Sequence, residues 1–418
     1  MSCLNKAQYL TNLKFQLNKL NFVKESDFDS VVNSLQDIDV IGFDIDFTLL
    51  EYNTVNMIKL MYESTCKYLI NHKNYPKEIE YKNYKNFIHS FSQKGYIIDI
   101  LKGNCLKLKN DKSIIKCYHG KKELDQERIK TLYKDGKFID YKNSDTIINE
   151  SFYITVDNFH SQNLPVFMIC VDFFDKGELK SVTCYKDIIT DILDGMNYNF
   201  NIPKFEEFSN FGYIFPEIFK DPDLYLVKND NDKLLRQLKE KGKYLFFCTN
   251  SNHSYSNFIL EKAFGKDYYQ YFDLCFYKCS KPKFFQESYI EESKCFFLDQ
   301  TGFNCSEFNN DIYEKILNEN KKLTGGSYSL IEKFYSTKLC RNNLKYIFVG
   351  DNILSDCKSA SSLPNWDSIF IYDLIDIKKK DSLKDNDENE LNIFSCYFKN
   401  KNCLLALPYV ECLNYIFN

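Results

Sequence analysis

Short apolar runs alternate along the chain with longer segments in which apolar residues recur every three or four positions. Four of these runs predict buried strands: residues 40–43, 244–248, 272–277 and 346–349. The Lys- and Leu-rich segment 231–240, followed by Gly242, predicts a helix that ends at the glycine. Because helical patterns lie between the strands, the chain is expected to form an α/β fold with a Rossmann-like, doubly wound parallel sheet.

A long segment, residues 55–232, separates the first of these strands from the second. Its pattern is partly helical, at 55–70, 164–174 and 185–196, and β-rich at 95–117. Because this segment interrupts the sheet, we expect it to form a separate α+β cap. Residues 1–54 and 233–418 are then expected to form the core.

Three other segments carry weaker patterns. Residues 1–39 predict an amphipathic helical lead-in, and a helical pattern runs from Asn310 to Leu323 before the turn at Gly325 and Gly326. The run 378–390 is charged and nearly free of apolar residues, which predicts a surface loop.

Composition narrows the class of protein. The 418 residues carry a net charge of −4, with basic and acidic residues interleaved, so no extended basic surface favours nucleic-acid binding. No stretch approaches the roughly eighteen consecutive apolar residues of a membrane span, and the N-terminus does not have the pattern of a signal peptide. We therefore expect a soluble, cytoplasmic protein.

The 16 cysteines are scattered singly, mostly inside apolar runs. This is typical of buried thiols in a reducing compartment. The closest pair, Cys275 and Cys279, has no second pair or histidines at zinc-site spacing. Disulfides and a zinc site are therefore not expected.

Candidate chemistry begins directly after the first strand. Asp44 and Asp46 follow Val40 to Phe43, and Thr48 comes two residues later. Ligands of open α/β sheets bind at the carboxyl ends of the strands. One carboxylate there can attack an electrophile while the other moves protons, and a divalent cation can hold their charges together. The structural alternative is an acidic turn that caps a following helix.

Three later strands also end in polar residues. Thr249, Asn250 and Ser251 suit phosphate oxygens, or alternatively an ordinary helix N-cap. Lys281, followed by Pro282, can neutralise a phosphoryl group, although isolated lysines are usually solvated. Asp351 and Asp356 offer a second acidic arm for Mg²⁺, or an Asx-turn. The conjunction of four such signals at four strand ends favours the catalytic interpretation.

In this order, D-x-D-x-T, T-N-S, K-P and G-D-x₄-D resemble the four motifs of the haloacid dehalogenase superfamily of phosphatases. The chain is more closely similar to its cytosolic purine 5′-nucleotidase family, which includes an IMP/GMP-preferring enzyme. The resemblance covers residues 35 to about 375 and is strongest at 41–49, 248–251, 281–285, 325–327 and 349–356.

The resemblance implies a role for each motif residue. Asp44 would be the nucleophile that forms an aspartyl-phosphate, and Asp46 the general acid and base. Thr249, Asn250 and Lys281 would bind the phosphoryl group. Mg²⁺ would be held by Asp44, the Asp46 carbonyl and Asp351, with Asp356 supporting that site.

The cap shows both matches and departures. Phe159 matches an aromatic that stacks on the purine, and Asp194 matches a substrate-binding aspartate. Asn197 and Thr190 replace the family's base-reading histidine and arginine, and Asn352 replaces a histidine of the metal motif. The resemblance therefore supports phosphatase chemistry more firmly than purine selectivity.

The leading hypothesis is a Mg²⁺-dependent 5′-nucleotidase acting on purine nucleoside 5′-monophosphates of the IMP/GMP type, with nucleoside phosphotransfer as a further activity. It would work as a homo-oligomer, a dimer or a tetramer. A second hypothesis keeps the chemistry but changes the substrate to another small phosphate ester. A third is a catalytically silent, nucleotidase-like binding protein, against which the intact set of five motif residues argues.

Overall fold

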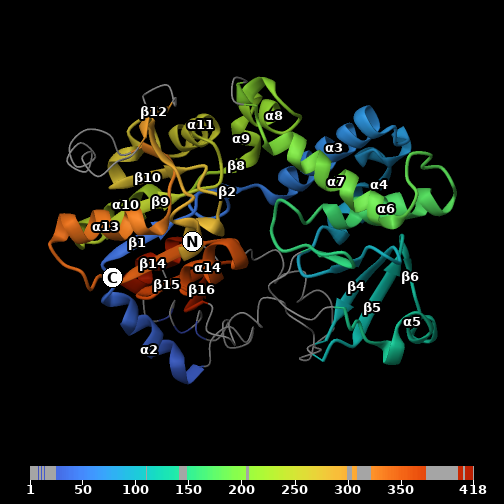
Figure 1. Cartoon of the computed structure of the whole chain (residues 1–418), viewed down its shortest axis with the longest axis horizontal. Helices are drawn as coiled ribbons and strands as arrows, with labels where there is room; N and C mark the ends of the chain where they lie inside the picture. Colours follow the sequence, from blue (N-terminus) through green and yellow to red (C-terminus); the bar gives the residue numbers. More distant parts are fainter. Residues whose placement is uncertain are drawn as a thin grey trace. The chain divides into compact units, whose positions relative to one another are not determined.

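A computed structural model describes residues 25–372 except 110, 141–147, 204–206, 299–303 and 308–321. It also describes 403–407, 410–417 and the single residues 8, 11 and 14. The described chain forms two compact units (Figure 1). The first contains the described residues before 52 and after 225, and the second contains 52–225.

The first unit is built on a sheet whose described strands follow the order β12-β11-β13-β10-β9-β1-β14-β15-β16. At its centre, β1 (Val40–Phe43) pairs in parallel with β9 (Tyr244–Cys248) and β14 (Tyr346–Gly350). β10 and β13 continue the parallel pairing beyond β9, and β15 and β16 continue it beyond β14. β11 pairs antiparallel with both β13 and β12. Their bounds are β10 (Leu274–Tyr277), β11 (Cys295–Leu298), β12 (Asn304–Glu307), β13 (Lys322–Gly325), β15 (Trp366–Ile371) and β16 (Leu405–Leu407).

The central strand is covered on both faces. All four residues of β1 are buried, which explains why its sequence is an unbroken apolar run. Gly42 lies against the ring of Phe246 on β9, and a Cβ at position 42 would come within 2.1 Å of that ring. The core around these strands is rich in aromatic side chains, including Tyr346 and Trp366, whose rings stack with centroids 4.7 Å apart.

Helices connect the parallel strands of this unit. They are α10 (Asn231–Glu240), α11 (His253–Phe264) and α13 (Tyr328–Leu339), with α2 (Glu25–Gln36) preceding β1. In α10 the leucines at 234, 235 and 238 are buried, as the periodic pattern predicts.

The second unit combines helices with an antiparallel sheet. The strands follow the order β6-β5-β4-β3-β7 and span Lys122–Glu123, Ile114–His119, Asn104–Leu108, Ile97–Asp99 and Phe152–Ile154. Helices α3 (Thr54–Lys73), α4 (Tyr81–Phe91), α6 (Asn163–Asp175) and α7 (Tyr185–Phe200) share a hydrophobic core with β3 and β4. Nearly every side chain of α6 is buried, which explains its continuous apolar sequence.

The predicted α/β class and the parallel pairing of the four predicted strands are confirmed. The assignment of 55–232 as a cap over the site stays a prediction. The helical pattern from Asn310 to Leu323 lies mostly outside the described residues, and it is wrong at its end, where Lys322–Gly325 is strand β13. Pairing with β10 outweighs the local helical period there.

The predicted lead-in helix lies outside the described residues over most of 1–24, as does the charged run 378–390. The described cysteines are free thiols, and most are buried. Within the described part of the chain, no helix is long and apolar enough to cross a bilayer.

Candidate active site

The carboxyl ends of the central strands bring the acidic motif residues together. Asp44 follows β1 directly, and its backbone N–H donates to the Val349 carbonyl of β14, 2.8 Å away. Asp351 follows the end of β14 at Gly350. Because β1 and β14 are parallel and in register, both aspartates leave the sheet at the same edge.

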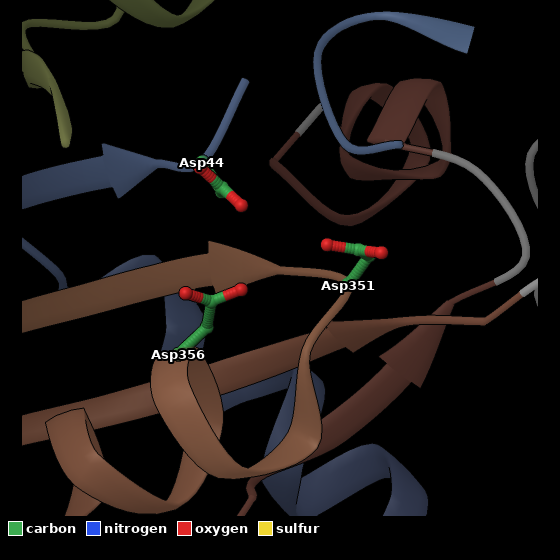
Figure 2. Close-up of side chains that lie close together, drawn as sticks. All are labelled: Asp44, Asp351 and Asp356. Atoms are coloured by element: carbon green, nitrogen blue, oxygen red, sulfur yellow. The ribbon is translucent and has the colours of Figure 1, made fainter. Parts of the chain in front are cut away.

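Asp356 completes an acidic cluster with these two residues. Carboxylate oxygens of Asp44, Asp351 and Asp356 all lie within 4.8 Å of one another, and Figure 2 shows the three side chains converging. Asp356 comes from the helical turn Ile353–Lys358, whose first N–H groups are capped by the side chain of Asn352. Asn352 thus shapes the turn.

Gly350 allows this turn to approach the strand. A Cβ at position 350 would lie 2.4 Å from the Asp356 carboxylate, too close for any side chain. The absence of a side chain at 350 is therefore what admits Asp356 to the cluster.

Lys281 is inserted between two of the carboxylates. Its Nζ lies 2.9 Å from Asp44 Oδ1 and 2.7 Å from Asp356 Oδ1, and its side chain is 2% exposed. Asn250 holds the lysine backbone through two bonds: it accepts from the Lys281 N–H at 2.6 Å and donates to the Lys281 carbonyl at 3.0 Å. Lys281 is therefore a fixed positive charge beside the expected nucleophile.

Burial and charge act in opposite directions on these groups. Burial raises the pKa of the Asp356 carboxyl to about 6, against the lowering effect of Lys281. Burial alone would lower the pKa of Lys281, but Asp356 and Asp44 outweigh it and hold that pKa well above its usual value. Lys281 therefore stays protonated at neutral pH.

The donor set fits a hard divalent cation. Carboxylate oxygens are the preferred ligands of Mg²⁺. Both oxygens of Asp356 are engaged, one by Lys281 and the other by the Asn352 N–H at 3.1 Å. Asp44 and Asp351 are therefore better placed as direct ligands, with Asp356 orienting its neighbours.

The other acidic motif residue, Asp46, meets the turn that follows β9. Its Oδ2 accepts a hydrogen bond of 2.8 Å from the Ser251 hydroxyl. Thr249, which is buried, accepts the Ser251 N–H on its Oγ1 at 3.1 Å. From the sequence, this turn was expected to bind phosphate, and a bond from Ser251 to Asp46 was not expected. A hydroxyl at the third position of a strand-end turn was the available signal.

The two expected base-binding residues both lie in the second unit. Phe159 meets Tyr52 and Phe200 with T-shaped ring contacts, at centroid distances of 6.5 and 5.7 Å. Asp194 forms an ion pair of 2.7 Å with Lys73, and its side chain is 43% exposed. Their part in substrate binding stays a prediction.

Lys73 and Thr190 show how this part of the unit is arranged. Lys73 also pairs with Asp191, at 2.8 Å, so one lysine ties α3 to two carboxylates of α7. Thr190 donates its hydroxyl to the Lys186 carbonyl of the same helix. The Asp194 carboxylate is thus paired with Lys73, and the Thr190 hydroxyl is already bonded to the Lys186 carbonyl.

Comparisons with known proteins agree with the motif pattern. A family model described as the 5′ nucleotidase family matches residues 31–389. Human 5′-nucleotidase domain-containing protein 1 is 29% identical over 360 residues, which cover 81% of this chain and 72% of the human protein. The bovine protein of that name is 28% identical over 360 residues, 81% of this chain and 73% of its own. A 5′-nucleotidase domain-containing protein of Dictyostelium discoideum is 24% identical over 366 residues, 84% of this chain and 56% of its own.

Proposed function

The chain belongs to the 5′-nucleotidase family, and we propose that it hydrolyses purine nucleoside 5′-monophosphates of the IMP/GMP type in a Mg²⁺-dependent reaction. Family membership confirms the prediction of a 5′-nucleotidase enzyme. The observation that supports the Mg²⁺-dependent phosphoryl chemistry is the position of Lys281, 2.9 Å from Asp44 in a cluster with Asp351 and Asp356. The purine preference rests on the resemblance at Phe159 and Asp194. We also propose that the fold is of the haloacid dehalogenase type, with 55–232 as the cap.

The proposed reaction has two displacements at phosphorus. In the first, an Asp44 carboxylate oxygen attacks, the bond from phosphorus to the 5′ oxygen breaks, and Asp46 gives its proton to the departing nucleoside. In the second, Asp46 takes a proton from water, the water oxygen attacks phosphorus, and inorganic phosphate leaves with Asp44 restored.

Phosphoryl transfer depends mainly on positioning and charge neutralisation. Lys281 and Thr249 would hold the phosphoryl oxygens in line with Asp44, and Asn250 would support them by fixing the Lys281 backbone. Three carboxylates meet in this cluster, so Lys281 alone leaves it negatively charged. A Mg²⁺ ion held by Asp44, Asp351 and the Asp46 carbonyl would offset that charge.

One observation keeps another small phosphate ester as a second candidate substrate. Asp194 is paired with Lys73, and the Thr190 hydroxyl is bonded within its own helix. A site with fewer matched partners for the base rejects wrong bases less strongly. We therefore expect weaker discrimination among nucleotides than the IMP/GMP-preferring enzymes achieve.

A panel of substrates tests the proposal. Phosphate release would be measured with Mg²⁺ from IMP, GMP, AMP, UMP and CMP at equal concentration, beside sugar phosphates and p-nitrophenyl phosphate. We expect IMP or GMP to exceed AMP and both pyrimidines, and a chelator to abolish release. A preference for pyrimidine nucleotides, or turnover of sugar phosphates alone, would contradict the assignment of purine nucleotides as substrates.

Phe159→Ala is expected to raise KM for IMP by roughly 5- to 150-fold, because stacking on an aromatic ring stabilises a base by about 1–3 kcal/mol. The KM for p-nitrophenyl phosphate should change little, since this substrate needs no base stacking. Steady-state kinetics on both substrates provide the measurement. Phe219→Ala, at an aromatic of the same unit that is 48% exposed, is the matched control. An unchanged KM for IMP would remove Phe159 from the site.

A further inference from the structure

We infer that Ser251 is a positioning residue, whose hydroxyl holds the Asp46 carboxyl group in the orientation that delivers a proton to the leaving nucleoside. This inference deepens the proposed function and rests on it. The observation behind it is the 2.8 Å hydrogen bond from Ser251 Oγ to Asp46 Oδ2, which joins two turns 205 residues apart in the chain.

The backbone of Ser251 is fixed from both sides. Its N–H donates to Thr249 Oγ1 at 3.1 Å, and its carbonyl accepts the Lys278 N–H at 3.0 Å. The backbone at Thr249, two residues earlier in the same turn, is also held, because the Cys279 N–H donates to the Thr249 carbonyl at 3.0 Å. The Ser251 hydroxyl therefore projects from a rigid turn, held to the end of β10.

The backbone at Asp46 is held in a similar way. Asp46 forms an isolated bridge with Leu50, and the Leu50 N–H donates to the Ile45 carbonyl at 2.9 Å. Asp46 is 8% exposed. With both backbones fixed, the hydrogen bond from Ser251 to Oδ2 acts on the rotation of the carboxyl group.

A hydroxyl suits this task in both halves of the reaction. It can donate to Oδ2 of the ionised carboxylate, and it can keep donating to that oxygen when the acid proton is on Oδ1, the oxygen that must then face the nucleoside. Asp46 alternates between these two states when it protonates the nucleoside and then takes a proton from water. The hydrogen bond from Ser251 can therefore persist in both protonation states of Asp46 and leave Oδ1 to carry the proton.

The competing interpretation is that Ser251 binds the phosphoryl group, as Thr249 and Lys281 are proposed to do. The two interpretations differ in which substrates suffer. Loss of a phosphate contact weakens every phosphate ester equally, because the phosphoryl group is common to all. Loss of proton delivery harms only those esters whose leaving group needs a proton, such as a nucleoside, and spares p-nitrophenolate.

The experiment compares wild-type protein with Ser251→Ala, Ser251→Thr and Ser251→Cys, on IMP and on p-nitrophenyl phosphate with Mg²⁺. Ser254→Ala is the matched control, because Ser254 is exposed at the start of α11 and its hydroxyl donates to Asn252 Oδ1, two residues away. Release of inosine or p-nitrophenol in the first turnover isolates the acid step. Steady-state rates then report the later hydrolysis of the phosphoryl-enzyme.

Ser251→Ala is expected to slow first-turnover release of inosine by roughly 10- to 100-fold, a part of the full effect of general acid catalysis. Release of p-nitrophenol should stay within about twofold of wild type, followed by a slower steady state because Asp46 also activates water. The substrate concentration that gives half the maximal first-turnover rate should stay unchanged for both substrates. Ser251→Thr should restore the inosine rate, and Ser251→Cys, with only a weak S–H donor, should resemble Ser251→Ala.

Several results would overturn the inference. An equal rise for both esters in the substrate concentration that gives half the maximal first-turnover rate, or an equal loss in both first turnovers, would make Ser251 a phosphate ligand. Variants that match wild type would leave Asp46 independent of Ser251. If wild-type protein turned over neither ester, the proposed function and this inference would both be wrong. If wild type turned over both and only the Ser251 predictions failed, the proposed function would stand. Melting curves of all variants would show whether any loss comes from unfolding.

Discussion

Asp44→Asn is expected to lower turnover of IMP on the order of 10⁴- to 10⁶-fold, the range seen when a residue of a nucleophilic triad is removed. The amide keeps the size of the carboxylate but cannot attack phosphorus. The fold should be retained, since Lys281 keeps its 2.7 Å ion pair with Asp356. Initial rates and a melting curve provide the measurement.

Acid-quenched wild-type protein should carry the mass of one phosphoryl group on the peptide that contains Asp44, and the Asn variant should not. Asp37→Asn is the control, because Asp37 is an exposed aspartate before β1 whose partner is Lys345. Near-native turnover by Asp44→Asn, or a phosphoryl group on another residue, would contradict the assignment of the nucleophile.

Lys281→Met is expected to lower the free energy of unfolding of the metal-free protein by about 3–5 kcal/mol, the effect of breaking a buried ion pair from one side. The variant leaves Asp44 and Asp356 without their cation. Added Mg²⁺ should restore part of the loss, because it supplies positive charge to the same carboxylates. Denaturant unfolding with and without Mg²⁺ measures both effects.

The loss in Lys281→Met should depend on pH in a defined direction. Asp356 has a pKa of about 6 in the folded protein, raised from 3.8. A carboxyl group whose pKa is raised on folding stabilises the fold below the unfolded value, and that stabilisation is lost as the pH rises through the folded value. Removing Lys281 raises this pKa further, so the loss should be largest above pH 6 and should shrink toward pH 4.

Lys338→Met provides the matched control for Lys281. Lys338 forms a 2.6 Å ion pair with Asp273, but its side chain is 30% exposed. Its replacement is expected to lower the free energy of unfolding by no more than about 1 kcal/mol. Equal losses in the two variants would show that burial of Lys281 has no special energetic weight.

The sequence was most informative where burial alone decides structure. Strands such as Val40–Phe43 and Tyr244–Cys248 are covered on both faces, so their apolar runs predict them with the observed bounds. Parallel order then places Asp44, Thr249 and Asp351 at one edge of the sheet. Strand β13 was missed because its pairing with β10 comes from a distant part of the chain.

Contacts made within turns were beyond the reach of sequence patterns. The bond between Ser251 and Asp46, and the two bonds between Asn250 and Lys281, depend on turn geometry that has no repeating period. The pairing of Asp194 with Lys73 spans 121 residues and follows from how α3 packs on α7. A lone lysine such as Lys281 carried little weight in the sequence, and only the burial of its side chain gives it significance.

The absence of a side chain at Gly350 limits how this acidic arm can change over evolutionary time. Even alanine there would collide with the Asp356 carboxylate, 2.4 Å away. A compensating change would have to shorten residue 356, and the cluster would then lose a carboxylate and Lys281 would lose a partner. Positions 350 and 356 therefore constrain each other. A single substitution at either position would disturb the cluster of Asp44, Asp351 and Asp356.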